Sequence, residues 1–179
     1  MRNDKITVLI PALKKAVAFQ DDLVKKFFDI SLVQRAIDKA IQLGIKVSNI
    51  HLLTDSEEIA LIGSRNNTKI YLDQSLTWSE DYNSGLLGKY LKQATNSSQY
   101  TLVLSPYAPL VEIDTLNHAL NALIESHKDI LKPVKLVKRR IFDNNGKSKL
   151  QSLFDDQKEI NRIESKAFTL IKSKIFQNK

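Results

Sequence analysis

The chain contains no cysteine among its 179 residues. Disulfide bonds, thiolate metal sites and thiol nucleophiles are therefore excluded, and redox chemistry gives no indication of the compartment. The chain also lacks any apolar run approaching the roughly 18 to 20 residues that a membrane-spanning helix needs, and no cleavable leader pattern follows its start. We therefore expect a cytoplasmic protein with no membrane partner.

The patterns of two common classes of hydrolase are also missing. His51, His118 and His127 show no i, i+4 pairing of metal ligands, which excludes a metal hydrolase of that type. Ser105 precedes Pro106 and lacks the glycine-flanked elbow that exposes a serine nucleophile. We expect Ser105 to form a turn or contact a substrate.

Length and composition indicate one soluble domain over residues 1–179. A chain of 179 residues with 42% hydrophobic content is long enough to bury a sizeable core. The net charge of +7 is uneven, because residues 1–127 carry 13 Lys or Arg against 14 Asp or Glu, and residues 128–179 carry 14 against 6. The densest basic stretch contains Lys132, Lys135, Lys138, Arg139 and Arg140.

This basic stretch favours a solvated surface, because a run of charge alone is weak evidence for a binding site. Neither an aromatic platform for single strands nor zinc-finger spacing accompanies it. Nucleic acid is therefore not the expected partner. A nucleic-acid binder acting through residues 132–140 remains the third alternative, and it would show salt-sensitive binding to unrelated oligonucleotides.

The apolar run of residues 6–12 predicts the first buried strand of an α/β sheet. Ligands of open α/β sheets bind in the crevice at the carboxyl ends of the strands, so the residues after Ala12 are the first place to expect a site. The turn there begins Leu13, Lys14, Lys15 and contains no glycine.

Strands and helices are predicted to alternate beyond this point. Ser31 is positioned to cap a helix that Gly44 ends, and Asp55 or Ser56 to cap the next one. The pattern predicts a three-layer α/β/α sandwich with a mainly parallel sheet and right-handed crossovers. Its predicted strands cover residues 49–53, 69–72 and 100–104, and its predicted helices residues 32–41, 56–63, 86–91 and 112–123.

The basic C-terminal third, residues 128–179, is poorly assigned by pattern. Residues 134–142 favour another strand and residues 144–146 a turn. Residues 167–171 fit a strand or a helix equally well.

Three segments in order resemble one enzyme family. Residues 8–12 read Val-Leu-Ile-Pro-Ala, residues 53–59 read Leu-Thr-Asp-Ser-Glu-Glu-Ile, and residues 104–110 read Leu-Ser-Pro-Tyr-Ala-Pro-Leu. Together they resemble the acylneuraminate/Kdo cytidylyltransferases, the CMP-sialic acid and CMP-Kdo synthetases, over residues 5–125. The resemblance implies the Rossmann-like nucleotide-diphospho-sugar transferase fold. It also implies transfer of CMP from CTP to an acidic sugar such as sialic acid, Kdo or a related nonulosonic acid.

The resemblance also implies which residues form the site. Lys14, Lys15 and Lys25 or its neighbour Lys26 would act as the catalytic cations on the triphosphate, and Trp78 would approach the sugar. The residues implied to bind the nucleotide follow the first and fourth predicted strands: Pro11, Ala12, Leu13, Lys14, Lys15, Ser105 and Tyr107.

The chain departs from the family at the phosphate loop. The family's loop reads approximately Arg-Gly-Gly-Ser-Lys-Gly, whereas here the arginine and both glycines are replaced, and Asp22 stands where a later lysine is expected. Side chains in place of glycine keep a phosphate away from the backbone amides, and a carboxylate repels it. CTP binding is therefore expected to be weak or differently arranged. A catalytically inactive domain that acts in partner binding or regulation is the alternative that these departures favour.

The metal position departs from the family as well. Nucleotidyl transfer uses a divalent ion, usually Mg²⁺, held by one or two carboxylates. The family's acid is replaced in the turn at Tyr107 and Ala108, which leaves Asp55 as the candidate metal ligand, although capping of the following helix is its expected role. CTP and an acidic sugar are the expected partners. Family members often form homodimers through an inserted segment for which this chain is short, so the oligomeric state is left open.

Overall fold

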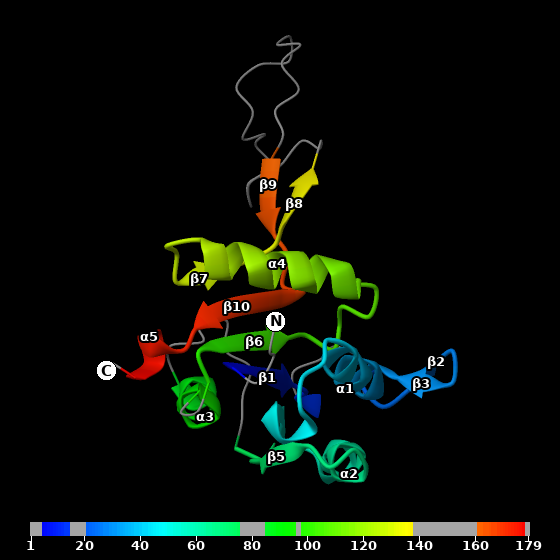
Figure 1. Ribbon diagram of the computed structural model, residues 1–179. Coiled ribbons are helices and arrows are strands. Elements are labelled where there is room, and N and C mark those ends of the chain that lie inside the picture. Colours follow the sequence, from blue (N-terminus) through cyan, green and yellow to red (C-terminus); the bar gives the residue numbers. More distant parts are fainter. Residues whose placement is uncertain (1–4, 15–20, 76–84, 96–97, 138–160, 178–179) are drawn as a thin grey trace, which may run out of the picture.

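The computed structural model describes residues 5–14, 21–75, 85–95, 98–137 and 161–177 (Figure 1). Within them, the helices are α1 (Leu32–Gln42), α2 (Glu57–Arg65), α3 (Gly85–Thr95), α4 (Ile113–Glu125), α5 (Lys174–Gln177) and the short 3-10 helix η3 (Val47–Asn49). The strands are β1 (Ile6–Pro11), β2 (Lys26–Phe27), β3 (Ile30–Ser31), β4 (Ile50–Thr54), β5 (Lys69–Leu72), β6 (Tyr100–Leu104), β7 (Ile130–Leu131), β8 (Val134–Val137), β9 (Asn161–Glu164) and β10 (Phe168–Lys172).

The central sheet has six strands in the order β5-β4-β1-β6-β10-β7. Strand β1 lies between two parallel neighbours, with Val8 opposite Ile50 of β4 and opposite Leu102 of β6. Strand β10 runs antiparallel to both β6 and β7. The prediction of a mainly parallel sheet is confirmed.

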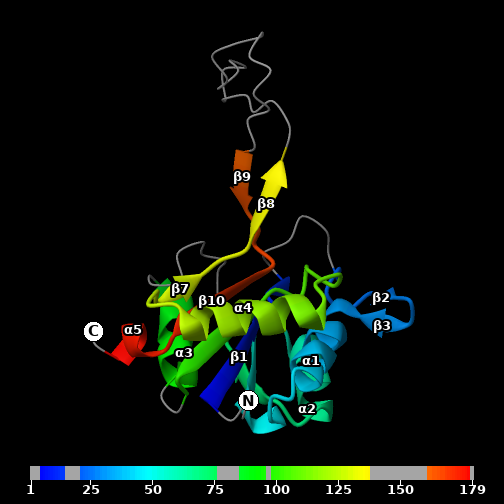
Figure 2. The ribbon, with the colours of Figure 1, turned by 45° about the horizontal axis from the view of Figure 1, so that its top comes forward.

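The sheet is covered on both faces, which accounts for the unbroken burial of β1. Val8 and Ile10 belong to the core that α1, α2 and α4 share, whereas Leu9 belongs to the core formed with α3 and α5. Because side chains alternate along a strand, a strand buried on both faces is apolar throughout. Figure 2 shows these helices around the sheet, in the predicted three-layer α/β/α arrangement.

Helix α1 forms where the sequence predicts it. The hydroxyl of Ser31 accepts a hydrogen bond of 3.2 Å from the amide of Gln34, which satisfies an amide that the first helical turn leaves free. Its inner side buries Val33 and Ile37. The chain leaves the helix through Gly44, whose φ of 74° is adopted readily by glycine.

A hairpin of β2 and β3 precedes α1, and the sequence analysis did not predict it. Its two-residue turn consists of Phe28 and Asp29, with φ values of 50° and 61°. Turns of this kind favour asparagine and glycine, so neither residue signalled a hairpin. Phe28 is 80% exposed at its tip.

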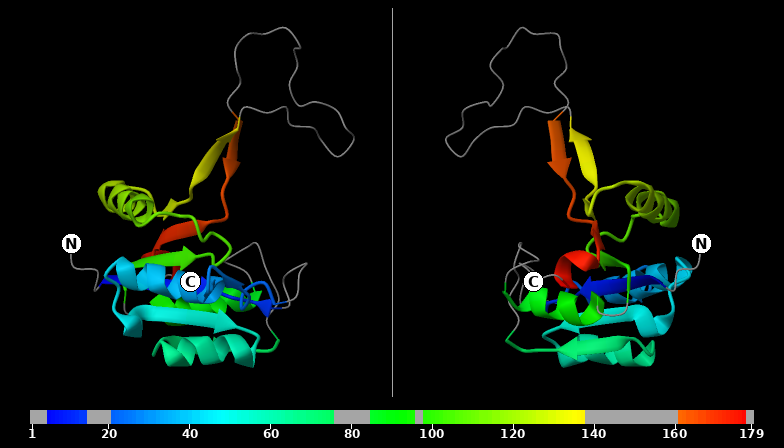
Figure 3. Two further views of the ribbon diagram at one scale, coloured as in Figure 1. Left: turned by 90° about the vertical axis from the view of Figure 1, so that its right-hand side faces the viewer. Right: turned by 60° about the vertical axis from the view of Figure 1, so that its left-hand side comes forward.

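The C-terminal third contains two separate pairings. Residues 167–171, which fitted a strand or a helix, contribute β10 to the central sheet. Strands β8 and β9 form an antiparallel pair that extends away from the central sheet (Figure 3). The predicted strand of residues 134–142 is seen only as far as Val137, and its remainder and the turn at residues 144–146 lie outside the described residues. No described helix is long and apolar enough to span a membrane.

Candidate functional site

The topology places a crevice at the carboxyl ends of β1 and β6. Helices α1 and α2 follow β1 and β4 on one face of the sheet, whereas α3, which leads into β6, packs on the other face. The direction of winding therefore reverses between β1 and β6, and a ligand of an open α/β sheet binds at such a reversal. Lys14 follows β1, and Tyr107 follows β6.

The turn after β1 is fixed by the end of β4. The amide of Ala12 donates to the carbonyl of Leu53 at 2.8 Å, and the amide of Lys14 donates to Oδ1 of Asp55 at 2.6 Å. Asp55 is only 6% exposed. We expected Asp55 to cap α2, but the N-cap position belongs to Ser56, and the Asp55 carboxylate lies toward the β1 turn instead.

The ammonium group of Lys14 contacts two carboxylates. It lies 2.7 Å from Oδ1 of Asp21 and 3.1 Å from Oε2 of Glu58 in the first turn of α2. Hydrogen bonds to Asp21 and then Glu58 raise the pKa of Lys14 above its ordinary value. The same contact with Lys14 lowers the pKa of the Asp21 carboxyl. Lys14 is therefore charged and paired at neutral pH.

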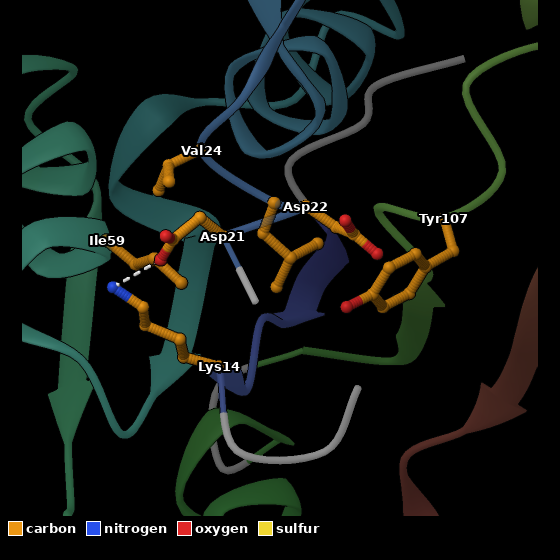
Figure 4. Close-up of a pocket in the computed structure, with 7 residues that line it drawn as sticks. Lys14, Asp21, Asp22, Val24, Ile59 and Tyr107 are labelled. Atoms are coloured by element: carbon orange, nitrogen blue, oxygen red, sulfur yellow. Dashed lines mark ion pairs between the residues drawn. The ribbon is translucent and has the colours of Figure 1, made fainter. Parts of the chain in front are cut away.

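A pocket lies beside this ion pair (Figure 4). It is lined by Lys14, Asp21, Asp22, Leu23, Val24, Ile59 and Tyr107. Its cavity volume of about 10 Å³ is far below the roughly 300–1,000 Å³ of pockets that enclose a whole small molecule. The described residues therefore form one wall of a ligand site and do not enclose a ligand of nucleotide size.

Tyr107 forms the wall of the pocket opposite Lys14 (Figure 4). Its amide donates to Oγ of Ser105 at 3.3 Å, and the Ser105 amide donates to the carbonyl of Ala167 at 3.0 Å. Burial, together with the charges of Asp22 and Asp55, raises the pKa of Tyr107 to about 12. The phenol is therefore neutral at pH 7 and retains its proton for donation.

Helix α1 supports the same loop from outside the pocket. The ammonium of Lys39 donates to the carbonyls of Ala108 and Pro109 at 3.2 and 3.0 Å. Burial, followed by the nearby charge of Arg35, lowers the pKa of Lys39. No local sequence pattern marks this role of Lys39, because the contact joins segments about 70 positions apart.

The structure brings together only part of the predicted site. Of the residues predicted to bind the nucleotide or act on it, Lys14 and Tyr107 line the pocket. Ser105 lies next to it and holds the Tyr107 amide. The side chains of Pro11, Ala12 and Leu13 are buried, and Leu13 packs in the core on the α3 face.

Other predicted residues lie elsewhere. Lys25 is exposed, and its amide donates to the carbonyl of Asp21 at 2.9 Å. Lys15 and Trp78 lie outside the described residues, as do three residues of the basic stretch at 138–140. Lys132 pairs with Glu164 at 2.8 Å. The pocket wall of residues 21–24 was not predicted, because apart from the acid at Asp22 it carries no recognisable motif.

Asp55 as a ligand of Mg²⁺ stays a prediction. Asp55 was the candidate ligand, but it is buried and its Oδ1 already accepts the Lys14 amide. Among the described residues, no group of three or more acidic, histidine or cysteine side chains is placed to hold a metal ion.

Comparison with solved structures identifies the architecture. A CMP:2-keto-3-deoxy-manno-octonic acid synthetase complexed with CTP superposes with a TM-score of 0.71 at 9% identity, over 97% of this chain and 76% of that one. The chain has the nucleotide-diphospho-sugar transferase fold. A 4-diphosphocytidyl-2C-methyl-D-erythritol synthase from Anaerococcus prevotii has a TM-score of 0.65 at 15% identity, over 97% and 73% of the two chains.

A third structure has the same architecture. A cytidylyltransferase from Leptospira borgpetersenii gives a TM-score of 0.61 at 14% identity, over 97% of this chain and 62% of that one. No protein-family model and no curated protein sequence matches the chain. At these identities the likeness is one of fold alone.

Proposed function

We propose that the protein binds CTP at the carboxyl ends of β1, β4 and β6 and transfers CMP to the hydroxyl group of an acidic sugar. One observation carries this proposal: the pocket between Lys14 and Tyr107 lies where the winding of the sheet reverses, the position at which this class of sheet binds ligands. A neighbour in fold is a synthetase complexed with CTP, which supports the choice of nucleotide.

The proposed chemistry assigns a role to Lys14 and to Tyr107. The sugar hydroxyl attacks the α-phosphorus of CTP and gives its proton to solvent, while the bond to the β-phosphate breaks and pyrophosphate leaves. Negative charge develops on the departing pyrophosphate, and Lys14 is the described cation placed to offset it. Tyr107, whose phenol is neutral at pH 7, donates a hydrogen bond to the bound nucleotide. Lys15 and Lys25 are proposed as further cations, and Trp78 as a sugar contact.

Binding and turnover are tested separately. Calorimetric titration with CTP, UTP, ATP and GTP in the presence of Mg²⁺ is expected to show preferential binding of CTP. Lys14→Ala is expected to weaken this binding about five- to tenfold, the size of effect expected for a lost charge-assisted hydrogen bond at a partly exposed site. Lys128→Ala removes the same charge at an exposed position after α4 and is expected to leave the affinity unchanged. Absence of binding to any nucleotide would reject the proposal.

Pyrophosphate release distinguishes an active enzyme from the alternative of a catalytically inactive domain. The pairing of Lys14 with two carboxylates favours this alternative, because both contacts compete with a phosphate for the same cation. With CTP and sialic acid or Kdo, an active enzyme releases pyrophosphate in proportion to the sugar consumed. CTP binding without release for any acidic sugar would support the inactive domain and remove the transfer step.

A further inference from the structure

The turn after β1 is bound by carboxylates of the chain itself where an anionic ligand would bind. Asp55, at the end of β4, accepts the Lys14 amide at 2.6 Å. Asp21 and Glu58 contact the Lys14 ammonium at 2.7 and 3.1 Å. Phosphate-binding turns offer an anion backbone amides and a cationic side chain. The backbone amide and the side-chain ammonium of Lys14 therefore both have acceptors within the chain already.

These contacts differ in how readily a ligand can replace them. The bond between the Lys14 amide and Asp55 involves a carboxylate that is only 6% exposed. By contrast, the side chains of the ion pairs are accessible, at 36% for Lys14, 44% for Asp21 and 58% for Glu58. Ion pairs of exposed side chains stabilise a fold little, because water screens them and both side chains lose freedom. A ligand can therefore replace the carboxylate partners of the Lys14 ammonium, while the backbone of the turn stays fixed.

Asp21 begins a hydrogen-bonded turn. Its backbone is left-handed, with a φ of 67°, and its carbonyl accepts the amides of Val24 and Lys25 at 3.1 and 2.9 Å. This tight turn presents the carboxylate to Lys14 at the edge of the pocket (Figure 4). Glu58 makes the longer contact from a more exposed position on α2. Asp21 is therefore the principal counter-ion.

We infer that Asp21, assisted by Glu58, forms a displaceable latch on the Lys14 ammonium, so that a phosphate group must displace it to bind. The inference rests on the proposed function and concerns the regulation of the same site. Asp21 is a positioning residue in this arrangement, because it acts on phosphate through Lys14. The latch lowers the affinity for polyanions, and ligand binding exchanges one anionic partner of Lys14 for another.

The test uses the full chain and two probes, inorganic tripolyphosphate and CTP, titrated by calorimetry at low ionic strength. Asp21→Asn removes the charge, and asparagine tolerates the left-handed backbone. It is expected to bind both probes about two- to fivefold more tightly than the parent chain, the range expected when an exposed ion pair no longer competes. Glu58→Gln is expected to give about a twofold gain, because its contact is longer and more exposed.

Matched controls separate the latch from a general change of charge. Asp29→Asn removes the same charge from another left-handed aspartate, in the turn of the β2–β3 hairpin. Glu57→Gln removes one from the neighbouring position in the first turn of α2. Both are expected to leave the affinities within about 1.5-fold of the parent, since charges that are distant or screened contribute little. Asp21→Glu retains the carboxylate and is expected to keep the weaker binding of the parent chain.

The two probes separate the latch from the proposed function. Tighter binding of tripolyphosphate by Asp21→Asn without binding of CTP supports the latch and rejects the nucleotide. Equal binding of CTP by the parent chain and by Asp21→Asn supports the nucleotide site and overturns the latch. If neither probe binds either chain, both proposals are rejected. Urea unfolding of each variant confirms that the compared chains are folded.

Discussion

The amide of Lys14 and the carboxylate of Asp55, 41 positions apart in the chain, are joined by a hydrogen bond of 2.6 Å. This bond connects the turn after β1 to the end of the neighbouring strand β4. The turn contains no glycine. Its path is fixed by the Asp55 carboxylate, which accepts the Lys14 amide. The position of Lys14 at the pocket therefore depends on Asp55 as well as on its own turn.

Removal of the Asp55 carboxylate is expected to destabilise the protein. Asp55→Ala leaves the Lys14 amide without this acceptor at a partly buried position, at a cost of about 1 to 3 kcal/mol in the free energy of unfolding. Asp55→Asn retains an acceptor oxygen and is expected to cost less. Urea denaturation measures the free energy of unfolding of both variants. Glu57→Ala, on the exposed side of α2, is the control and is expected to stay within about 0.5 kcal/mol of the parent chain. Equal stability of all three variants would contradict this role of Asp55.

Gly63 brings α2 close to the sheet. A Cβ atom there would lie 2.7 Å from Cδ2 of Leu52 and 3.1 Å from Cγ1 of Ile70. Gly63→Ala improves helix propensity by about 1 kcal/mol, but overpacking of a core typically costs about 1 to 3 kcal/mol. We expect a net loss of stability by thermal or urea unfolding. Ser64→Ala, at the adjacent exposed position, is the control and is expected to stabilise the protein slightly. A gain of stability in both variants would show that α2 moves away from the sheet without cost.

His51 makes the stability dependent on pH. It is 4% exposed, and burial, followed by the charge of Lys69, lowers its pKa from 6.5 to about 4. Between these values the unfolded chain binds a proton that the folded chain does not. Stability is therefore lost as the pH falls from 6.5 to 4, by at most about 3 kcal/mol. Urea unfolding at several pH values measures the slope.

The matched variant for this measurement is His51→Asn. Its amide stands in for Nδ1, which lies 3.1 Å from the hydroxyl of Tyr71. The variant does not titrate in this range, so its unfolding free energy is expected to change less between pH 6.5 and pH 4. An unchanged slope would assign the pH dependence to other groups.

Asp73 is expected to titrate at low pH. Hydrogen bonds from Ser75 and then from the Tyr90 hydroxyl, at 2.7 Å, lower its pKa from 3.8 to about 2. Ser75→Ala is therefore expected to raise the pKa of Asp73 toward 3.8 by more than Tyr90→Phe does. Carboxyl chemical shifts followed by NMR across the acid range give both values. A larger effect of Tyr90→Phe would reverse the order of the two contributions.

Local sequence signals were sufficient for the elements near the site. The run of residues 6–12 predicted β1 because a strand covered on both faces has no polar alternation. Ser31 and Gly44 predicted the ends of α1, because caps depend on residues close in sequence. The parallel order followed from the alternation of strands and helices.

Other features carried no local signal. The hairpin turn of Phe28 and Asp29 lacks the Asn-Gly or Asp-Gly pair that favours its backbone conformation. Residues 167–171 became a strand through pairing with β6, more than 60 positions earlier. Strand pairing of this kind depends on a partner segment that is distant in sequence. The local pattern of residues 167–171 therefore does not indicate it.

The sequence by itself determined the class of fold and the edge of the sheet at which a site belongs, because burial periodicity and helix caps act over a few residues. Only the tertiary structure decided which side chains meet at that edge. Asp55 and Glu58 lie 41 and 44 positions after Lys14, and both converge on it together with the nearby Asp21. Contacts between segments far apart in the chain depend on the packing of the whole sheet, and that packing makes Lys14 a paired cation.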